Sequence, residues 1–243
     1  MKNIFPSITA YSNCFSVSNP IQFQKDLLAW QQKAGLTRER RALFNQIKQE
    51  TGVTPDKEFA TDLAHEFAVL TTRFDESIAI IQLKDGSKLQ PVLYNISTMS
   101  SETTGRFNYA KIPFFLLGDA FSSFRQPYFT ILDNYLVLAN SVTALNNYMQ
   151  VYNAQNFLTK SERYNEFDNL LAEQCNIASS VYFNNAAYLL KRDLKPAAYQ
   201  IIYPEQKDAT TYYAGSYQLS STNKQFYTNF CMQLNHPDSV KSK

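Results

Sequence analysis

The chain has 243 residues, of which 44% are hydrophobic, 14% aromatic and 18% charged. This composition supports a buried core and excludes a chain that is disordered throughout. The 23 basic and 21 acidic residues give a net charge of +2 without a long block of like charge, which excludes the basic surface of a nucleic-acid-binding protein.

The first part of the chain is predicted to be mainly helical. A strand over residues 8–17 leads into Asn19-Pro20, a capping residue followed by a proline, which favours a helix start. Apolar residues at helical spacing then predict helices over 19–35 and 37–52, and Thr54-Pro55 predicts the start of a short third helix. The side chains expected to face the core here are Phe23, Leu27, Trp30, Ala34, Phe44 and Ile47.

From residue 67 the apolar period changes from 3.6 to 2, which is typical of strands. Asp85-Gly86 predicts a hairpin between the last two of three strands, which span residues 67–74, 76–84 and 88–97. A short apolar turn or helix is expected at 113–118. It precedes a second hairpin that turns at Asp133-Asn134, between strands at 128–132 and 135–139. This order predicts antiparallel strands and not β-α-β units.

The end of the chain is predicted to contain more strand than helix. A strand, a helix and two long strands rich in Tyr and Phe are expected over residues 177–184, 186–194, 210–220 and 224–234. The polar tail 235–243 is interpreted as a linker toward a further domain.

An internal repeat is visible when the chain is aligned with itself at a shift of 122 residues. The pair Leu36-Thr37 then meets Leu158-Thr159, and a strand, a helix, this Leu-Thr joint and a second helix occur twice. The other matches are Phe23 with Leu145, Leu27 with Met149, Trp30 with Tyr152 and, after one inserted residue, Phe44 with Phe167 and Ile47 with Leu170.

The repeat predicts an α+β fold of two pseudo-repeated halves, residues 1–127 and 128–234, each an antiparallel sheet covered on one face by a helix pair. The halves form either two domains or one compact domain. The matched helical positions of the second half are also expected to be mostly buried, namely Leu145, Met149, Tyr152, Phe167 and Leu170.

Phosphate-binding, acyl-transfer and zinc motifs are missing from the sequence. The six glycines are at least 13 residues apart, whereas phosphate-cradling loops and nucleophile elbows need glycines within about six residues. His65-Glu66 resembles the start of H-E-x-x-H, but Val69 stands where the second histidine belongs, and His236 lies in the polar tail. We expect no cofactor, no metal site and no catalytic residues, while chemistry by carboxylates alone leaves no sequence trace and stays open.

Cysteine and hydropathy patterns bear on the cellular compartment. Cys14, Cys175 and Cys231 are far apart, which excludes a zinc cage by spacing and favours free buried thiols, while one disulfide stays open. No apolar run reaches the roughly 18 residues that span a bilayer, and residues 1–6 have no hydrophobic signal segment. The chain is thus expected to be cytoplasmic or to be a mature or truncated part of a longer protein.

Two stretches resemble a known family. The first contains Phe129, Leu132 and residues 133–141, followed by Leu145, Leu158 and Phe167; the second is 213–220 with 226–230. They resemble a domain of unknown function from cell-envelope proteins of Bacteroidetes-type bacteria. The resemblance implies a region outside the cytoplasm, behind an N-terminal membrane anchor and often before a β-propeller-like region. It implies no catalytic residues.

Aromatic residues gather in the last two predicted strands: Tyr212, Tyr213, Tyr217, Phe226, Tyr227 and Phe230. Strict alternation places Tyr213 and Tyr217 on one face and Tyr212 on the other. Tyr213, Tyr217 and Tyr227 are the candidate contacts for a ligand or partner, because exposed tyrosines give rigid amphipathic contact area. Packing under helices or across strands is the alternative interpretation.

Together these observations favour a non-catalytic interaction or scaffold module of an extracytoplasmic envelope protein. Its expected partner is a flanking domain or another envelope protein. A glycan- or peptide-binding domain that uses exposed tyrosines, and an enzyme of unrecognised type, are the alternatives. A flat apolar patch would favour the first hypothesis, an exposed tyrosine row the second, and convergent carboxylates the third.

Overall fold

The computed structural model describes residues 1–205, 211–222 and 225–235. The chain forms two compact units, and neither is continuous in sequence. Unit 1 consists of Met1–Phe15, Leu70–Glu76 and Gln150–Lys243, and unit 2 of Ser16–Val69 and Ser77–Met149. The predicted boundary between residues 127 and 128 therefore lies inside unit 2.

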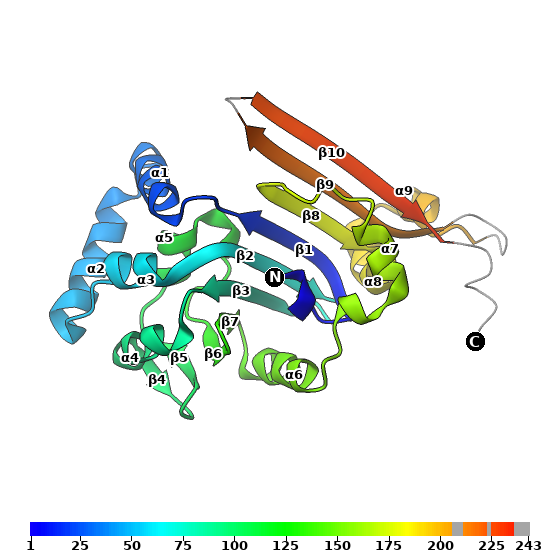
Figure 1. The fold of residues 1–243 in the computed structure, drawn as a ribbon. Helices are drawn as coiled ribbons and strands as arrows, with labels where there is room; N and C mark the ends of the chain where they lie inside the picture. Colours follow the sequence, from blue (N-terminus) through cyan, green and yellow to red (C-terminus); the bar gives the residue numbers. More distant parts are fainter. Residues whose placement is uncertain (206–210, 223–224, 236–243) are drawn as a thin grey trace. The chain divides into compact units, whose positions relative to one another are not determined.

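Unit 1 is built around an antiparallel sheet with the strand order β10-β9-β8-β1 (Figure 1). Its strands are β1 (Thr9–Ser16), β8 (Ile177–Tyr182), β9 (Tyr212–Thr222) and β10 (Gln225–Leu234). Its helices are η1 (Lys2–Ile4), η3 (Leu158–Lys160), α7 (Glu162–Asp168), α8 (Phe183–Asp193) and α9 (Pro196–Ile202).

Unit 2 contains the strands in the order β2-β3-β7-β6-β5-β4. These strands are β2 (Leu63–Thr72), whose last residues belong to unit 1, β3 (Ser77–Leu83), β4 (Ser97–Met99), β5 (Thr104–Phe107), β6 (Tyr128–Leu132) and β7 (Tyr135–Ala139). Its helices are α1 (Pro20–Lys33), α2 (Thr37–Thr51), α3 (Pro55–Asp62), α4 (Gly86–Ile96), α5 (Ile112–Leu117), η2 (Asp119–Phe121) and most of α6 (Val142–Asn153).

The predicted α+β class with antiparallel strands is confirmed. Several predicted elements are present as well, including the hairpin of β6 and β7, where Asp133 has a φ of 52°. The element order strand, helix, helix occurs twice, as β1-α1-α2 and β7-α6-α7. However, Leu36 is the N-cap of α2, whereas Leu158 begins the 3-10 helix η3, so the matched positions lie in different elements and the pseudo-repeat is not confirmed.

Helix α1 begins as predicted but presents a different face to the core. Asn19 caps it by accepting a hydrogen bond from the Gln22 N–H at 3.1 Å. The buried positions are Gln24, Leu27 and Gln31, whereas Trp30 is 44% exposed. The prediction that Trp30 lies in the core is wrong.

The reason is that polar side chains of α1 satisfy the end of another helix. The Gln24 amide donates to the Leu116 carbonyl at 2.8 Å, and the Gln31 amide donates to the Phe115 carbonyl at 3.0 Å. Both acceptors lie in the last turn of α5, where carbonyl groups have no partner within the helix. The two glutamines are therefore buried because they are hydrogen-bonded, and α1 is rotated to bring them inward.

The predicted hairpin at Asp85-Gly86 is wrong, since residues 86–96 form helix α4. Asp85 is the N-cap of this helix and accepts a hydrogen bond from the Ser87 N–H at 3.1 Å. A Cβ atom at Gly86 would lie 2.7 Å from the Asp133 carbonyl oxygen, so the glycine permits a close approach rather than a turn. The buried residues Leu89, Leu93 and Ile96 follow helical spacing.

The remaining predicted core positions divide into three groups. Leu27, Phe44, Ile47, Leu145 and Phe167 are buried. Phe23, Ala34, Met149 and Tyr152 are half-buried or exposed, and Leu170 is 55% exposed, so its predicted burial is wrong. Leu170 follows the end of α7, where the chain leaves the helix.

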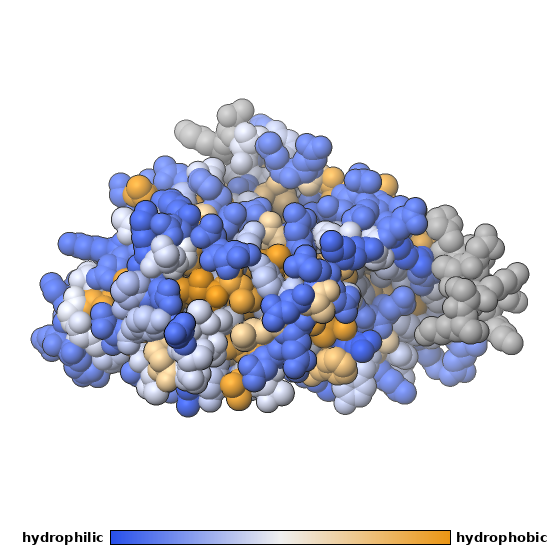
Figure 2. All heavy atoms as spheres, turned by 60° about the horizontal axis from the view of Figure 1, so that its bottom comes forward, coloured by the Kyte–Doolittle hydropathy of each residue, from blue (hydrophilic) through white to orange (hydrophobic). Residues whose placement is uncertain are grey.

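The surface view in Figure 2 presents a largely hydrophilic face with hydrophobic residues in small separate groups. Among the described residues, the helices are all too short or too polar to cross a membrane.

The revised helix faces give a test by substitution. Phe167→Ala is expected to lower the free energy of unfolding by about 3–5 kcal/mol, because this ring is fully buried and contacts Tyr182 and Tyr213. Trp30→Ala, which removes a half-exposed ring, should cost less than about 1 kcal/mol. Urea unfolding of both variants measures this, and equal losses would contradict the assigned faces.

Candidate functional site

The sheet of unit 1 has two faces with different surroundings. Residues directly opposite one another in antiparallel strands lie on the same face. Tyr11 is opposite Val181, Val181 opposite Gly215, and Gly215 opposite Met232. We name the face that carries these side chains the open face, although Ala186 and Leu189 of α8 pack near its Tyr11 and Val181, and the other the covered face.

The covered face packs against helix α7. The ring of Tyr182 lies 6.0 Å from that of Tyr164 and 6.4 Å from that of Phe167, measured between centroids. All three rings are buried. Aromatic residues of α7 thus form the cover of this face.

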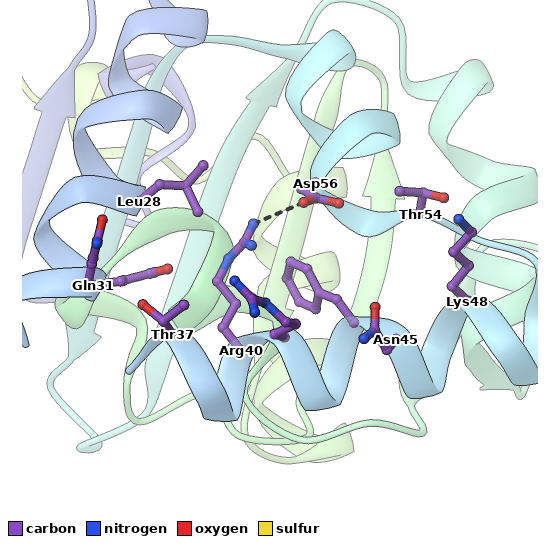
Figure 3. Close-up of a pocket in the computed structure, with 11 residues that line it drawn as sticks. Leu28, Gln31, Thr37, Arg40, Asn45, Lys48, Thr54 and Asp56 are labelled. Carbon is purple, nitrogen blue, oxygen red and sulfur yellow. Dashed lines mark hydrogen bonds and ion pairs between the residues drawn. The ribbon is translucent and has the colours of Figure 1, made fainter. Parts of the chain in front are cut away.

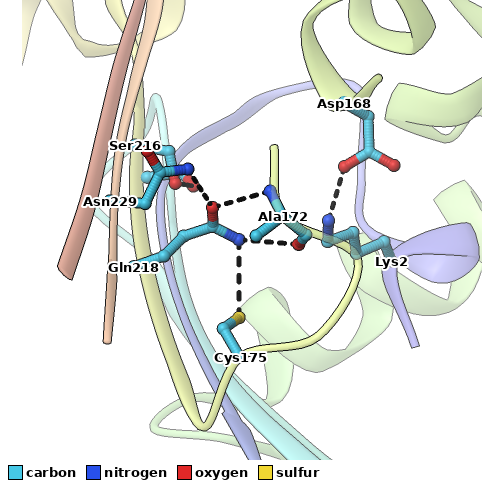
Figure 4. Close-up of polar contacts among 8 residues, drawn as sticks. Lys2, Asp168, Ala172, Cys175, Ser216, Gln218 and Asn229 are labelled. Carbon is cyan, nitrogen blue, oxygen red and sulfur yellow. Dashed lines mark hydrogen bonds and ion pairs between the residues drawn. The ribbon is translucent and has the colours of Figure 1, made fainter. Parts of the chain in front are cut away.

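Gln218 ties the segment after α7 to the covered face (Figure 4). Its side-chain oxygen accepts hydrogen bonds from the Ala172 N–H at 2.9 Å and from the Asn229 amide at 3.0 Å. Its side-chain nitrogen donates to the Ala172 carbonyl at 3.0 Å and lies 3.5 Å from the Cys175 sulfur. The amide therefore pairs with the backbone of Ala172 as a neighbouring strand would.

The open face contains a hollow of about 370 Å³. Its walls come from all four strands and the start of α8, through Tyr11, Asn13, Ser179, Val181, Phe183, Gly215, Tyr217, Phe230 and Met232. Phe230 is 65% exposed and Met232 is 39% exposed. The polar groups Ser179 and Asn13 are joined by a hydrogen bond of 2.8 Å, so the hollow is mainly apolar and aromatic.

Tyr213, one of the predicted contact residues, lies on the covered face. Gln233 pairs with Ala214 and Leu234 with Tyr212, so a β-bulge leaves Tyr213 as the extra residue of β9. Its ring contacts Phe167, and the Arg163 guanidinium lies 4.7 Å above its centre. The prediction that Tyr213 and Tyr217 share a face is therefore wrong.

The structure does not bring the three predicted tyrosines together. Tyr217 is 47% exposed and lines the hollow of the open face. Tyr227 is 51% exposed, but it is opposite Ser220 and belongs to the covered side of β10, where its hydroxyl donates to Gln225 at 2.6 Å. Of the three candidates, Tyr217 alone borders the hollow.

Sequence reasoning missed the residues that accompany Tyr217. Phe230 belongs to the predicted aromatic cluster, whereas Met232, Val181 and Tyr11 do not. Their shared face follows from the strand order and register, which join β1 to strands 160 residues or more away along the chain. The one available signal was the alternation of Phe226, Phe230, Met232 and Leu234 with more polar residues.

Residues considered for chemistry are dispersed. His65 lies exposed in β2, with its Nδ1 atom 2.9 Å from the Val17 carbonyl oxygen. Cys14, Cys175 and Cys231 form no disulfide and are half-buried, and His236 lies outside the described residues. Within residues 1–205, 211–222 and 225–235, His, Cys, Asp and Glu side chains form no group of three that could hold a metal ion.

A second hollow of about 400 Å³ lies among α1, α2 and α3 of unit 2 (Figure 3). The Arg40 guanidinium donates to the Asp56 carboxylate at 3.2 Å and lies 4.4 Å above the centre of the Phe44 ring. Arg41 and Lys48 line the hollow from the exposed side of α2. Arg40 thus joins α2 to α3, and the hollow is polar.

Comparisons with known proteins show no family for this chain. The chain matches no protein-family model and no curated protein. It is similar to two crystal structures of TP0453. Crystal form III has 8% identity over 97% of this chain and 80% of that chain, with a TM-score of 0.45. Crystal form I has 9% identity over 99% and 82%, with a TM-score of 0.38. Both scores are below 0.5, so neither likeness bears on function.

The Gln218 contacts predict a stability effect. Gln218→Ala should lower the free energy of unfolding by about 1–3 kcal/mol, because it removes four hydrogen-bonding contacts of a buried amide. The control is Ser220→Ala, which removes one contact, of 3.2 Å, to the exposed Gln174 carbonyl. Chemical unfolding measures both, and an effect of Gln218→Ala no larger than that of the control would contradict the assigned role.

The buried phenols of the covered face predict a loss of stability in alkali. Burial raises the pKa of the Tyr164 and Tyr182 hydroxyls above the ordinary value of 10.0. The neutral phenols therefore stabilise the folded state fully below pH 10.0, and this contribution is lost as the pH rises toward the folded-state pKa. Tyr182→Phe should make the decline in unfolding free energy between pH 10 and about pH 11.5 shallower than in the wild type. Tyr188→Phe, at an exposed position of α8, should leave the decline unchanged.

Proposed function

We propose that this protein is a non-catalytic protein-binding module and that the open face of unit 1 receives its partner. The observation that carries the proposal is the hollow of about 370 Å³ between Tyr11, Val181, Tyr217, Phe230 and Met232. Concave sites with apolar and aromatic walls suit a large apolar side chain, and such anchors contribute most of the binding energy in protein interfaces.

The exposure of the walls supports the same role. Phe230 and Met232 expose 65% and 39% of their surface, and they lie in β10, whose residues 225–230 are exposed on both faces. Apolar area contributes about 25 cal/mol per Å² when it is removed from water. Covering these side chains by a partner would therefore be favourable, and contiguous exposed apolar groups commonly mark interaction sites.

The chemistry of the hollow favours binding over catalysis. Its described lining residues include no carboxylate, histidine, cysteine or cationic side chain. Ser179 donates its hydroxyl proton to Asn13, and neither residue has a basic neighbour in the lining that would activate a nucleophile. The open face is therefore suited to bind a partner whose shape and apolar surface match the hollow.

The proposed setting is a cell-envelope protein outside the cytoplasm, with a flanking domain or another envelope protein as the partner. The resemblance of residues 128–145 and 213–230 to an envelope domain supports this setting. Glycan binding by a row of tyrosines is less well supported, because Tyr213 and Tyr227 belong to the face opposite Tyr217.

A substitution in the floor of the hollow tests the proposal. Gly215 has ordinary backbone geometry, and a Cβ atom there would lie 3.4 Å from Met232 and 3.5 Å from Val181. Gly215→Val should therefore fill the hollow while keeping the strand. The matched control is Ser221→Val, on the same face of β9 but outside the lining residues.

The probe is a displayed library of random peptides selected on the wild-type protein. We expect enriched peptides to carry an aromatic or large aliphatic anchor, to bind Gly215→Val at least tenfold more weakly, and to bind Ser221→Val normally. Failure to enrich any peptide, or equal binding to Gly215→Val with an unchanged melting temperature, would overturn the proposal. A saccharide from a glycan array that binds and protects Tyr217 from modification would instead favour the glycan-binding alternative.

A further inference from the structure

Strand β10 is the last strand of the unit 1 sheet. It pairs with β9 over its whole length, and on its other side no strand follows among the described residues. An edge strand presents unpaired backbone N–H and C=O groups, which can pair with another chain. The outer edge of β10 is thus a place where a further strand fits.

β10 lacks the features by which proteins usually protect such an edge. Natural edge strands carry lysine, other inward-pointing charges, proline or a short length. Residues 225–234 contain no Lys, Arg, Asp, Glu or Pro over ten positions. The one irregularity of the pairing lies at the end of the strand, between Gln233 and Leu234. Strand β10 itself therefore carries no charge that would repel an uncharged strand, although the Arg163 guanidinium donates to the Leu234 carbonyl at 3.5 Å, at the end of the strand.

We infer that the outer edge of β10 pairs antiparallel with β10 of a second copy of this chain, about a two-fold axis at Phe230. The inference deepens the proposed function, on which it rests, by naming a second copy as one partner of this sheet. Two-fold symmetry is the commonest way in which identical chains associate, and it uses the same surface on both copies.

The sequence of β10 is complementary to itself in this register. Phe226 would lie opposite Leu234 of the second copy, Thr228 opposite Met232, and Phe230 opposite its own equivalent. Each of these pairs lies on the open face, where Phe226 is 75% and Leu234 is 48% exposed. Apolar pairs directly opposite across strands stabilise a sheet.

A neighbouring register fits less well. Centring the axis on Asn229 would place the partner position of Leu234 before the start of β10 at Gln225. Leu234 would then remain exposed at the end of the paired segment. With the axis at Phe230, the unpaired end residue is instead the polar Gln225. The apolar pattern therefore selects the register centred on Phe230.

Sedimentation over a range of protein concentrations tests the association. The wild-type chain should shift from monomer to dimer mass as its concentration rises, because a single strand pair buries less area than a standard interface. Phe230→Lys places two like charges opposite each other and should weaken self-association at least tenfold. Tyr188→Lys, at a 70% exposed position of α8 in the same unit, should leave it unchanged.

Disulfide trapping tests the register. In a background with Cys14→Ser and Cys175→Ser, Asn229→Cys should form a disulfide-linked dimer with Cys231 of the second copy, because positions 229 and 231 are opposite in this register. Tyr227→Cys in the same background is the matched control and should give little dimer, because position 227 is opposite Gln233. A higher yield from Tyr227→Cys would overturn the register.

The two proposals fail separately. A wild-type chain that stays monomeric at all concentrations would overturn self-pairing, and so would a dimer that Phe230→Lys leaves intact. Neither result changes peptide binding, which is measured in Gly215→Val. Loss of peptide binding with an intact dimer in Gly215→Val would support both proposals, because Gly215 lies in β9 and not at the outer edge of β10, although Phe230 and Met232 belong to both the hollow and the paired strand.

Discussion

The hydrogen bonds that the buried side-chain amide of Gln218 requires determine which face of the unit 1 sheet is covered. This side chain exchanges two hydrogen bonds with the backbone of Ala172 and accepts a third from Asn229. A buried amide without these partners would be costly, so the segment after α7 must lie over Gln218. Because neighbouring residues of a strand alternate, Tyr217 then points to the other face. The hydrogen bonds of Gln218 on the covered face thus place Tyr217 on the open face.

The bulge at Tyr213 shows how one residue redistributes the aromatic side chains. Without it, Tyr213 and Tyr217 would share the open face, and Tyr212 would lie under α7. With it, Tyr213 packs against Phe167 and Tyr212 lies 5.7 Å from the ring of Phe183. The candidate site consequently combines Tyr217 with Phe230 and Met232 instead of a row of tyrosines. Its chemistry is therefore that of an apolar hollow.

Helix α1 illustrates why hydropathy alone assigned the wrong face. The apolar residues Phe23, Leu27 and Trp30 predict one core stripe, but burial follows Gln24, Leu27 and Gln31. The carbonyl groups at the end of α5 require donors, and two glutamine amides supply them. The apolar periodicity of one helix contains no information about the carbonyl groups that lack a hydrogen-bond partner at the end of a neighbouring helix.

Local signals in the sequence determined the elements that depend on a few adjacent residues. The cap at Asn19, the end of α2 at Gly52, where φ is 76°, and the turn at Asp133-Asn134 were predictable because each meets a backbone requirement within its own segment. The α+β class followed from the change of apolar period. Tertiary structure alone decided the faces and the site. Asp85 caps a helix where a turn was predicted, and the Gly86 N–H donates to the Asn134 side chain at 3.0 Å. The hollow formed because β1, β8, β9 and β10 meet in one register. Such contacts join residues far apart in the chain, and their energies are absent from any local pattern.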